Sequence, residues 1–93
     1  MIYQPNPIDT SAVQLSPDLL ELTELLAKNT HDIWARQRMK DGWRFGPVRD
    51  DAKKEHPCLI AYEELPEIER EYDRQTAIET LRLIVALGYR ITR

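Results

Sequence analysis

The sequence predicts a single, mainly helical α+β domain, on three observations. Apolar residues recur at helical spacing in two segments, about 17–41 and 66–87. Between them, residues 43–62 are rich in aromatic and β-branched side chains and are interrupted by Gly and Pro, which favours short strands joined by loops. A chain of 93 residues is long enough for one hydrophobic core and too short for two. We therefore expect two antiparallel helices, short β-strands and an extended N-terminal arm within one domain, residues 1–93.

Residues 1–15 are the predicted arm, because their prolines remove backbone donors and favour extended conformations. The first helix should begin at Ser16, whose hydroxyl can cap it, with Pro17 at the first helical position. Gly42 should end this helix, since glycine tolerates the left-handed conformation that follows many helices. The side chains at helical spacing that we expect on its buried face are Leu19, Leu22, Leu25, Leu26 and Ile33.

The second helix should begin at Pro66 and end before Gly88. A break near Asp73 is an alternative, because aspartate is a favourable N-cap residue. Residues 89–92 predict a short C-terminal strand. The apolar side chains expected on the buried face of the second helix are Leu65, Ile68, Tyr72, Ile78, Leu81, Ile84 and Val85.

Charge is unevenly distributed along the chain, although the net charge is only −3. Residues 34–54 are predominantly basic, whereas residues 63–79 are predominantly acidic. A general nucleic-acid-binding protein would carry a basic excess over the whole domain, because it must neutralise many phosphates. We therefore expect no general nucleic-acid binding, while the basic segment suits recognition of the phosphate of a small ligand.

The chain lacks the sequence features of a secreted or membrane protein. Its one cysteine, Cys58, cannot form an internal disulfide, and the N-terminus has no basic start followed by an apolar stretch. The longest strongly apolar run, residues 83–87, is far shorter than the roughly 20 residues that a membrane span needs. We expect a cytoplasmic protein without a membrane segment.

Candidate catalytic and metal-binding groups are sparse and poorly spaced. Cys58 with His31 or His56 would supply a thiol and a base, but a cysteine within an apolar run is more often a small buried side chain. The metal-ligand candidates are the pair His31 and Asp32 and the group of Asp50, Asp51 and His56, yet the spacing matches neither zinc nor calcium patterns. The three glycines are scattered, which excludes a glycine-rich phosphate loop. We expect no catalysis, no cofactor and no metal ion.

A group of aromatic and guanidinium side chains is the strongest candidate for a ligand site, because such groups suit stacking and anion recognition. Trp34 lies one residue off the predicted apolar stripe and has Arg38 one turn along the same helix. An aromatic residue at the edge of an apolar face can be a ligand platform or part of the core, and both interpretations of Trp34 remain open. The residues that we expect to bind the ligand are His31, Trp34, Arg38 and Arg49.

The residues that follow the first helix also have a structural interpretation. Trp43 and Phe45 would alternate into the core from a short strand, which is the interpretation that we favour for these two side chains. Arg44 and Arg49 would then pair with the acidic second helix.

Seven segments of the chain form a pattern that is specific when taken together. They are 26–35 (LAKNTHDIWA), 42–51 (GWRFGPVRDD), 54–59 (KEHPCL), 65–67, 71–74, 79–81 and 86–89. With these segments the chain resembles the ryanodine receptor repeat domain, in the single-copy form of bacterial and phage proteins. The resemblance covers nearly the whole chain from Pro5 onward, which makes it far more specific than one short motif.

The resemblance implies a compact α+β unit of two antiparallel helices with short strands and without known enzymatic activity. Receptor repeats occur as tandem pairs related by an approximate two-fold axis, and the cleft between them has been linked to adenine nucleotide binding. The channel function of the receptors does not carry over, and neither does their phosphorylated insertion, which this chain lacks.

We therefore expect a non-enzymatic module that binds a nucleotide or another phosphorylated small molecule as a homodimer, since a chain with one copy recreates the paired arrangement by association. The alternative is a protein-interaction or assembly module that uses the acidic helix and the surface of the first helix, without a small ligand. A hydrolase built on His31, Asp32 and His56 is a third, less favoured hypothesis.

Overall fold

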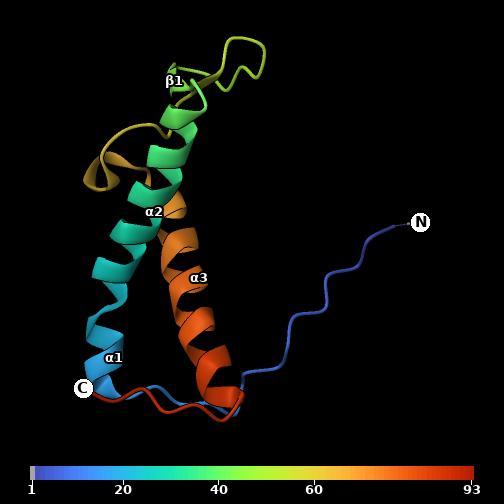
Figure 1. Cartoon of the computed structure of the whole chain (residues 1–93), viewed down its shortest axis with the longest axis vertical. Helices are drawn as coiled ribbons and strands as arrows, with labels where there is room; N and C mark the ends of the chain where they lie inside the picture. The colour runs from blue at the N-terminus through green and yellow to red at the C-terminus, as the bar shows by residue number, and fades with distance from the viewer. Residues whose placement is uncertain (1) are drawn as a thin grey trace.

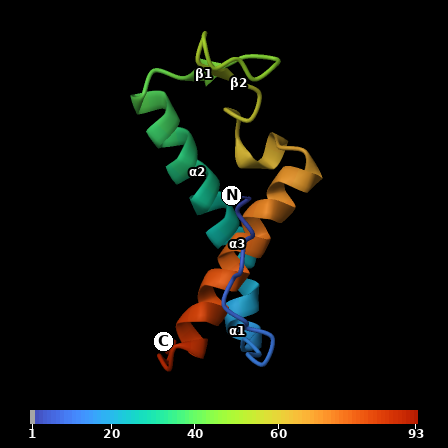
Figure 2. The ribbon, with the colours of Figure 1, turned by 90° about the vertical axis from the view of Figure 1, so that its right-hand side faces the viewer.

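The computed structural model describes residues 2–93, and Met1 lies outside the described residues. The chain is mainly helical, with a small two-stranded sheet (Figure 1). The elements, in chain order, are α1 (Pro17–Glu21), α2 (Thr23–Lys40), β1 (Arg44–Phe45), β2 (Glu55–His56), the 3-10 helix η1 (Tyr62–Glu64) and α3 (Glu67–Ala86). The long helices α2 and α3 pack against each other and diverge toward the end of the molecule that carries β1 and β2 (Figure 2). The predicted mainly helical α+β class is therefore confirmed.

The first helix is interrupted, so the prediction of one helix over 17–41 was wrong. Leu22 separates α1 from α2. The Thr23 hydroxyl donates a 2.7 Å hydrogen bond to the Leu20 carbonyl, so a side chain competes for a backbone acceptor at the break. The predicted cap is present, because the Ser16 hydroxyl accepts a backbone N–H from the first turn of α1.

The buried face of α2 is not the predicted leucine and isoleucine stripe. Leu25 is 65% exposed and Ile33 is 50% exposed, whereas Ala27 and His31 are buried. Ala27 packs into the core against apolar residues that precede α3. His31 donates a 2.7 Å hydrogen bond from Nε2 to the carbonyl of Ile60. A buried imidazole needs such a partner, so this bond helps to fix the rotation of α2, in which Leu25 and Ile33 face outward and Leu26 is half-buried.

The helix α3, Glu67–Ala86, is continuous, so the alternative of a break near Asp73 was wrong. Ala77 is buried, while Ile68 and Tyr72, which the sequence placed in the core, are exposed. Neither α3 nor any other helix among residues 2–93 is long and apolar enough to cross a membrane.

An ion pair joins the first half of α3 to α2. The Arg74 guanidinium bonds Glu24 of α2 and also pairs with Glu67 and Glu71 on its own helix. The Tyr62 hydroxyl donates to the same Glu24 carboxylate over 3.2 Å. Charged and hydroxyl groups therefore contribute to the contact between the two helices, while Ile68 and Tyr72 remain exposed.

Regular structure ends with α3. Gly88 has a φ of 97°, the left-handed conformation expected of the predicted stop. The predicted strand over 89–92 was wrong, because these residues pair with no strand in the described part of the chain. The C-terminal residues lie instead beside α1, near Leu19 and Leu22 (Figure 1).

The segment between α2 and η1 carries the predicted short strands, which are parallel. Arg44 of β1 is in register with Glu55 of β2. Gly46 lies very close to this pair, and a Cβ atom on it would be only 2.6 Å from the Cβ of Glu55. Any other residue at position 46 would therefore have to displace Glu55. Phe45 is exposed and Trp43 is half-buried, so the prediction that both side chains enter the core was wrong for Phe45.

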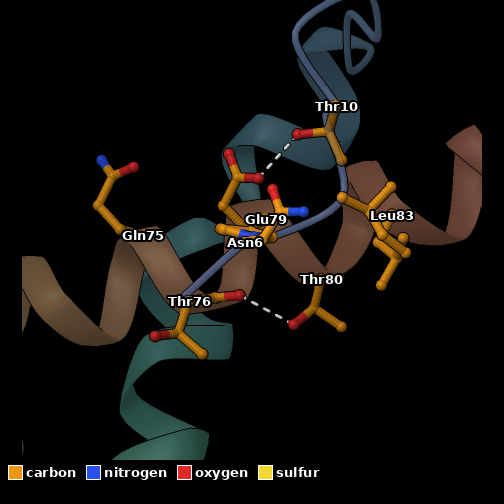
Figure 3. A pocket seen from close by; sticks show the side chains of 9 residues that line it. Asn6, Thr10, Gln75, Thr76, Glu79, Thr80 and Leu83 are labelled. Atoms are coloured by element: carbon orange, nitrogen blue, oxygen red, sulfur yellow. Dashed lines mark hydrogen bonds between the residues drawn. The ribbon is translucent and has the colours of Figure 1, made fainter. Parts of the chain in front are cut away.

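A hydrogen bond joins the N-terminal segment to α3. The buried Thr10 hydroxyl donates to the Glu79 carboxylate over 2.7 Å (Figure 3). Residues 2–9 have no regular secondary structure, and residues 6–8 line a hollow beside α3. The chain before them leads away from the helices (Figure 1). Thr10 is the residue through which the segment is hydrogen-bonded to α3.

Candidate ligand-binding site

Guanidinium and indole groups meet where α2 ends and the chain turns back. The Cζ atom of Arg38 lies 5.7 Å from the ring centroid of Trp34 and 4.8 Å from that of Trp43. Arg49 approaches Trp43 from the following loop, with its Cζ 6.0 Å from the centroid. These distances allow cation–π attraction, so the four side chains form one guanidinium–indole cluster.

The end of α2 brings Trp43 into this cluster. Gly42 takes a φ of 91°, and its N–H donates to the carbonyl of Met39. The N–H of Trp43 then donates to the Arg38 carbonyl over 3.0 Å. This pair of bonds is a Schellman motif, in which the residue after the glycine returns to the last turn of the helix. Sequence reasoning assigned Trp43 to the core, although the glycine at the helix end was a signal that could have placed it beside Arg38.

Two imidazoles complete the aromatic surroundings of Trp34. The His31 ring lies 5.6 Å from the Trp34 ring between centroids, and His56 meets Trp34 edge-on at 5.0 Å. His31 bonds the Ile60 carbonyl through Nε2, and His56 accepts the backbone N–H of Cys58 at Nδ1 over 3.0 Å. Both imidazoles are thus held by the backbone. His31, predicted to bind the ligand, is buried and contacts Trp34 directly.

A cavity of about 250 Å³, which we call the Trp34 recess, opens beside the cluster. Trp34 lines it from α2, and His56 and Cys58 line it from the segment before η1. The carboxylates of Glu69 and Asp73 line it from α3. Sequence reasoning missed both carboxylates, although their spacing of four residues on a helix places them on one face.

Partial burial affects the protonation of the groups in the Trp34 recess. Burial raises the pKa of Asp73 above its usual range. Burial and two nearby guanidinium groups lower the pKa of His56. Burial, together with nearby carboxylates, raises the pKa of the Cys58 thiol, which disfavours the thiolate that a nucleophile requires. In the described part of the chain, no three His, Cys, Asp or Glu side chains are placed to hold a metal ion.

The arginines of this region differ in their ionic partners. Arg49 donates from Nε to Asp51 over 2.9 Å, and Arg44 pairs with Glu55 at 3.1 Å. The prediction that these two arginines pair with the acidic helix was therefore wrong, because both pair with carboxylates of the segment between α2 and η1. Arg38 forms no ion pair within residues 2–93. Its guanidinium is available to an anionic ligand.

A larger hollow, of about 610 Å³, lies between the N-terminal segment and α3 (Figure 3). Among residues 2–93, the one charged side chain that lines it is Glu79, which already accepts from Thr10 and pairs with Arg82. The described lining offers no cation for a phosphate and no aromatic ring for stacking. The guanidinium–indole cluster and the Trp34 recess together are therefore the candidate site.

The structure brings all four predicted site residues into one connected group of contacts. His31 contacts Trp34, and Arg38 lies over Trp34. Trp43 completes the connection, because both Arg38 and Arg49 lie over its ring. Their part in ligand binding stays a prediction.

The amino-acid sequence matches the family model of the RyR domain over residues 3–93. The match includes every side chain of the guanidinium–indole cluster and of the Trp34 recess. The resemblance to the ryanodine receptor repeat domain is thereby confirmed, and the candidate site lies wholly within the matched region.

Proposed function

Because the chain belongs to the RyR domain family, we propose that it is a non-enzymatic binding module that recognises a nucleotide or another phosphorylated small molecule as a homodimer. The observation that carries this proposal is the position of Arg38 over both Trp34 and Trp43, without an ionic partner among residues 2–93. An aromatic ring stacks on a base, and a guanidinium takes up a phosphate. The cluster therefore offers one contact for each of the two main parts of a nucleotide.

The arrangement supports binding through a site that exists before the ligand arrives. Trp34 is half-buried, so part of its ring remains for a ligand while the rest is held by neighbouring side chains. The backbone fixes both imidazoles that contact it. A preformed site avoids part of the entropic cost of ordering side chains on binding. In this proposal α2 and α3 form an antiparallel scaffold, and the module acts in the cytoplasm.

A homodimer would cover apolar side chains that one chain leaves exposed. Leu25 and Ile33 lie about two turns apart on α2, and Ile68 and Tyr72 lie one turn apart on α3. All four are exposed, and groups of exposed apolar residues often mark contact surfaces. A two-fold pair is the commonest closed assembly, and it would recreate the pairing that the resemblance to receptor repeats implies.

Ligand-induced stabilisation tests the proposal. The melting temperature of the full chain is measured alone and with ADP, GDP, adenosine, guanosine or pyrophosphate. A ligand that binds only the folded state stabilises that state. We expect a nucleoside diphosphate to raise the melting temperature more than the matching nucleoside, because only the diphosphate offers phosphates to the guanidinium groups. Absence of any shift, together with absence of heat in calorimetric titrations, would contradict the proposal.

The exposed apolar groups also favour a second function, an interaction or assembly module without a small ligand. Light scattering separates the two functions when combined with the melting experiment. A stable dimer that Leu25→Glu and Ile33→Glu dissociate, in a protein that no nucleotide stabilises, would support assembly alone. A nucleotide-dependent shift that survives in the dissociated variant would instead support ligand binding by one chain.

A further inference from the structure

The two carboxylates of the Trp34 recess have no partner within residues 2–93. Glu69 and Asp73 lie one turn apart on α3 and both line the recess. Neither carboxylate accepts a hydrogen bond or forms an ion pair with a described residue. Glu67 and Glu71 of the same helix differ, because both pair with Arg74. The recess therefore holds acceptors to which the described part of the chain offers no donor.

Asp73 has lost part of its hydration without a compensating bond. Burial is the largest cause of the rise in its pKa, since the charged form loses contact with water. A ligand N–H group at this position would supply the missing hydrogen bond. Bonds from N–H groups to an ionised carboxylate are stronger than those between neutral groups. The carboxylates thus favour a ligand with N–H donors.

Trp34 touches two regions of opposite charge. The carboxylates share the recess with its ring, while the Arg38 guanidinium lies over the ring at 5.7 Å. A ligand that is cationic throughout would be repelled by Arg38, and a simple anion would be repelled by the carboxylates. The ligand that fits both regions presents N–H donors at one end and negative charge at the other.

Among the common nucleobases, guanine matches a carboxylate best. An ionised carboxylate only accepts hydrogen bonds, and its two oxygens can accept in parallel. Guanine has two adjacent donors on one edge, the ring N1–H and the exocyclic N2 amino group. Adenine and cytosine place an acceptor beside their amino group, and uracil places its N3–H between two acceptors. An acceptor facing a carboxylate would leave both groups without a bond.

We infer that the Trp34 recess receives the base of a guanine nucleotide. Asp73 or Glu69 accepts from N1–H and N2–H of the base, Trp34 contacts its ring face, and Arg38 takes the phosphates. This inference rests on the proposed nucleotide binding and narrows its ligand class. The volume of about 250 Å³ is below the roughly 300–1,000 Å³ of pockets that enclose a drug-sized ligand. The recess therefore holds the base and leaves the phosphates outside, where the guanidinium groups lie.

Calorimetric titration of the full chain with GDP, IDP and ADP tests the inference. IDP differs from GDP only by the missing N2 amino group. We expect GDP to bind at least about tenfold more tightly than either, because one charge-assisted hydrogen bond is lost with IDP and the donor pattern is wrong in ADP. The link of receptor repeats to adenine nucleotides gives the opposite expectation. ADP binding as tight as GDP would overturn the guanine inference and leave the proposed function standing, whereas absence of binding by all three would remove both.

Near-isosteric variants test the two carboxylates. We expect Asp73→Asn or Glu69→Gln to bring the ratio of the GDP affinity to the IDP affinity close to one, with little change in ADP affinity. Glu71→Gln is the matched control, because Glu71 lies on the same helix and pairs with Arg74. Thermal melts verify that each variant is folded, and the wild-type comparison of GDP with IDP needs no variant. A preference that survives both recess substitutions would overturn the assignment of Glu69 and Asp73.

Discussion

The Arg38 guanidinium lies over the Trp43 ring, with its Cζ 4.8 Å from the ring centroid. The backbone joins the same two residues, because the Trp43 N–H donates to the Arg38 carbonyl over 3.0 Å. The side-chain contact is thus a consequence of the way in which α2 ends. A phosphate that meets Arg38 therefore finds a guanidinium whose position is already restricted.

Arg38→Gln should weaken the binding of a nucleoside diphosphate by about tenfold or more, because a charge-assisted contact with phosphate is lost. Affinity for the nucleoside should change little. Arg36→Gln is the matched control, since Arg36 is an exposed cation on the same helix. Calorimetric titrations at low and high salt measure both variants, and salt should weaken wild-type binding more than that of Arg38→Gln. Equal losses in the two variants would show that total charge, and not the cluster, governs affinity.

Trp34→Ala should both destabilise the fold and remove nucleotide binding. We expect the free energy of unfolding to fall by about 2 kcal/mol. This is less than the roughly 3–5 kcal/mol lost when a fully buried aromatic residue is replaced by alanine, because Trp34 is half-buried. Stacking is worth about 1–3 kcal/mol per base, so the nucleotide-dependent shift in melting temperature should also disappear. Trp34→Phe should retain part of the wild-type stability and part of the nucleotide-dependent shift. Denaturant unfolding and thermal melts measure the two quantities, and a shift that persists in Trp34→Ala would place the ligand elsewhere.

The ion pairs of Arg74 should stabilise the contact between α2 and α3. Arg74→Gln leaves Glu24 and two carboxylates of α3 close together without their shared cation. We expect the melting temperature to fall by several degrees, and the difference from wild type to shrink at high salt. Arg82→Gln is the control, because Arg82 pairs with Glu79 within one helix and such a pair is worth at most about 0.5 kcal/mol. Similar effects of the two substitutions would argue against a special role for Arg74.

Protonation of His56 should destabilise the fold. Its Nδ1 accepts the Cys58 N–H, and a proton on this atom would abolish the bond at a cost of about 1 kcal/mol. Burial, followed by the charges of Arg49 and Arg38, lowers the pKa of His56 from its ordinary value of 6.5. The unfolded chain therefore takes up this proton at higher pH than the folded chain. The contribution of neutral His56 to the free energy of unfolding is fully present above pH 6.5. It is lost as the pH falls through the pKa of His56 in the folded state.

Denaturant titrations across this pH window measure the effect. His56→Asn is the control, because the amide oxygen can accept the same N–H and does not titrate. We expect the free energy of unfolding of the wild type to fall more steeply below pH 6.5 than that of the variant. Parallel curves would assign the pH dependence to other groups.

Local signals predicted the ends of the helices better than their buried faces. The Ser16 cap and the Gly42 stop depend on a few adjacent residues, and both were confirmed. The break at Leu22 has no glycine or proline to mark it. The hydrogen bond between His31 and Ile60, which are 29 residues apart, helps to fix the rotation of α2. Apolar spacing within the helix cannot predict such a long-range contact.

The candidate site was predictable where helical spacing or a turn rule applied. Trp34 and Arg38 lie one turn apart on α2, so their proximity follows from the period of the helix. Glu69 and Asp73 belong to an acidic segment that resembles any solvated helix surface. Only the packing of α3 near Trp34 shows which of its carboxylates face the recess.

The helix α1 has five residues, none of them buried, and Leu22 separates it from α2. Its amide hydrogens can therefore exchange with deuterium through a local opening that leaves α2 packed against α3. Native-state hydrogen exchange should give the amides of 17–21 opening free energies well below that of global unfolding. The amides around Ala27, in the core, should exchange only when the whole domain unfolds. The guanidinium–indole cluster would then remain assembled during the opening of α1.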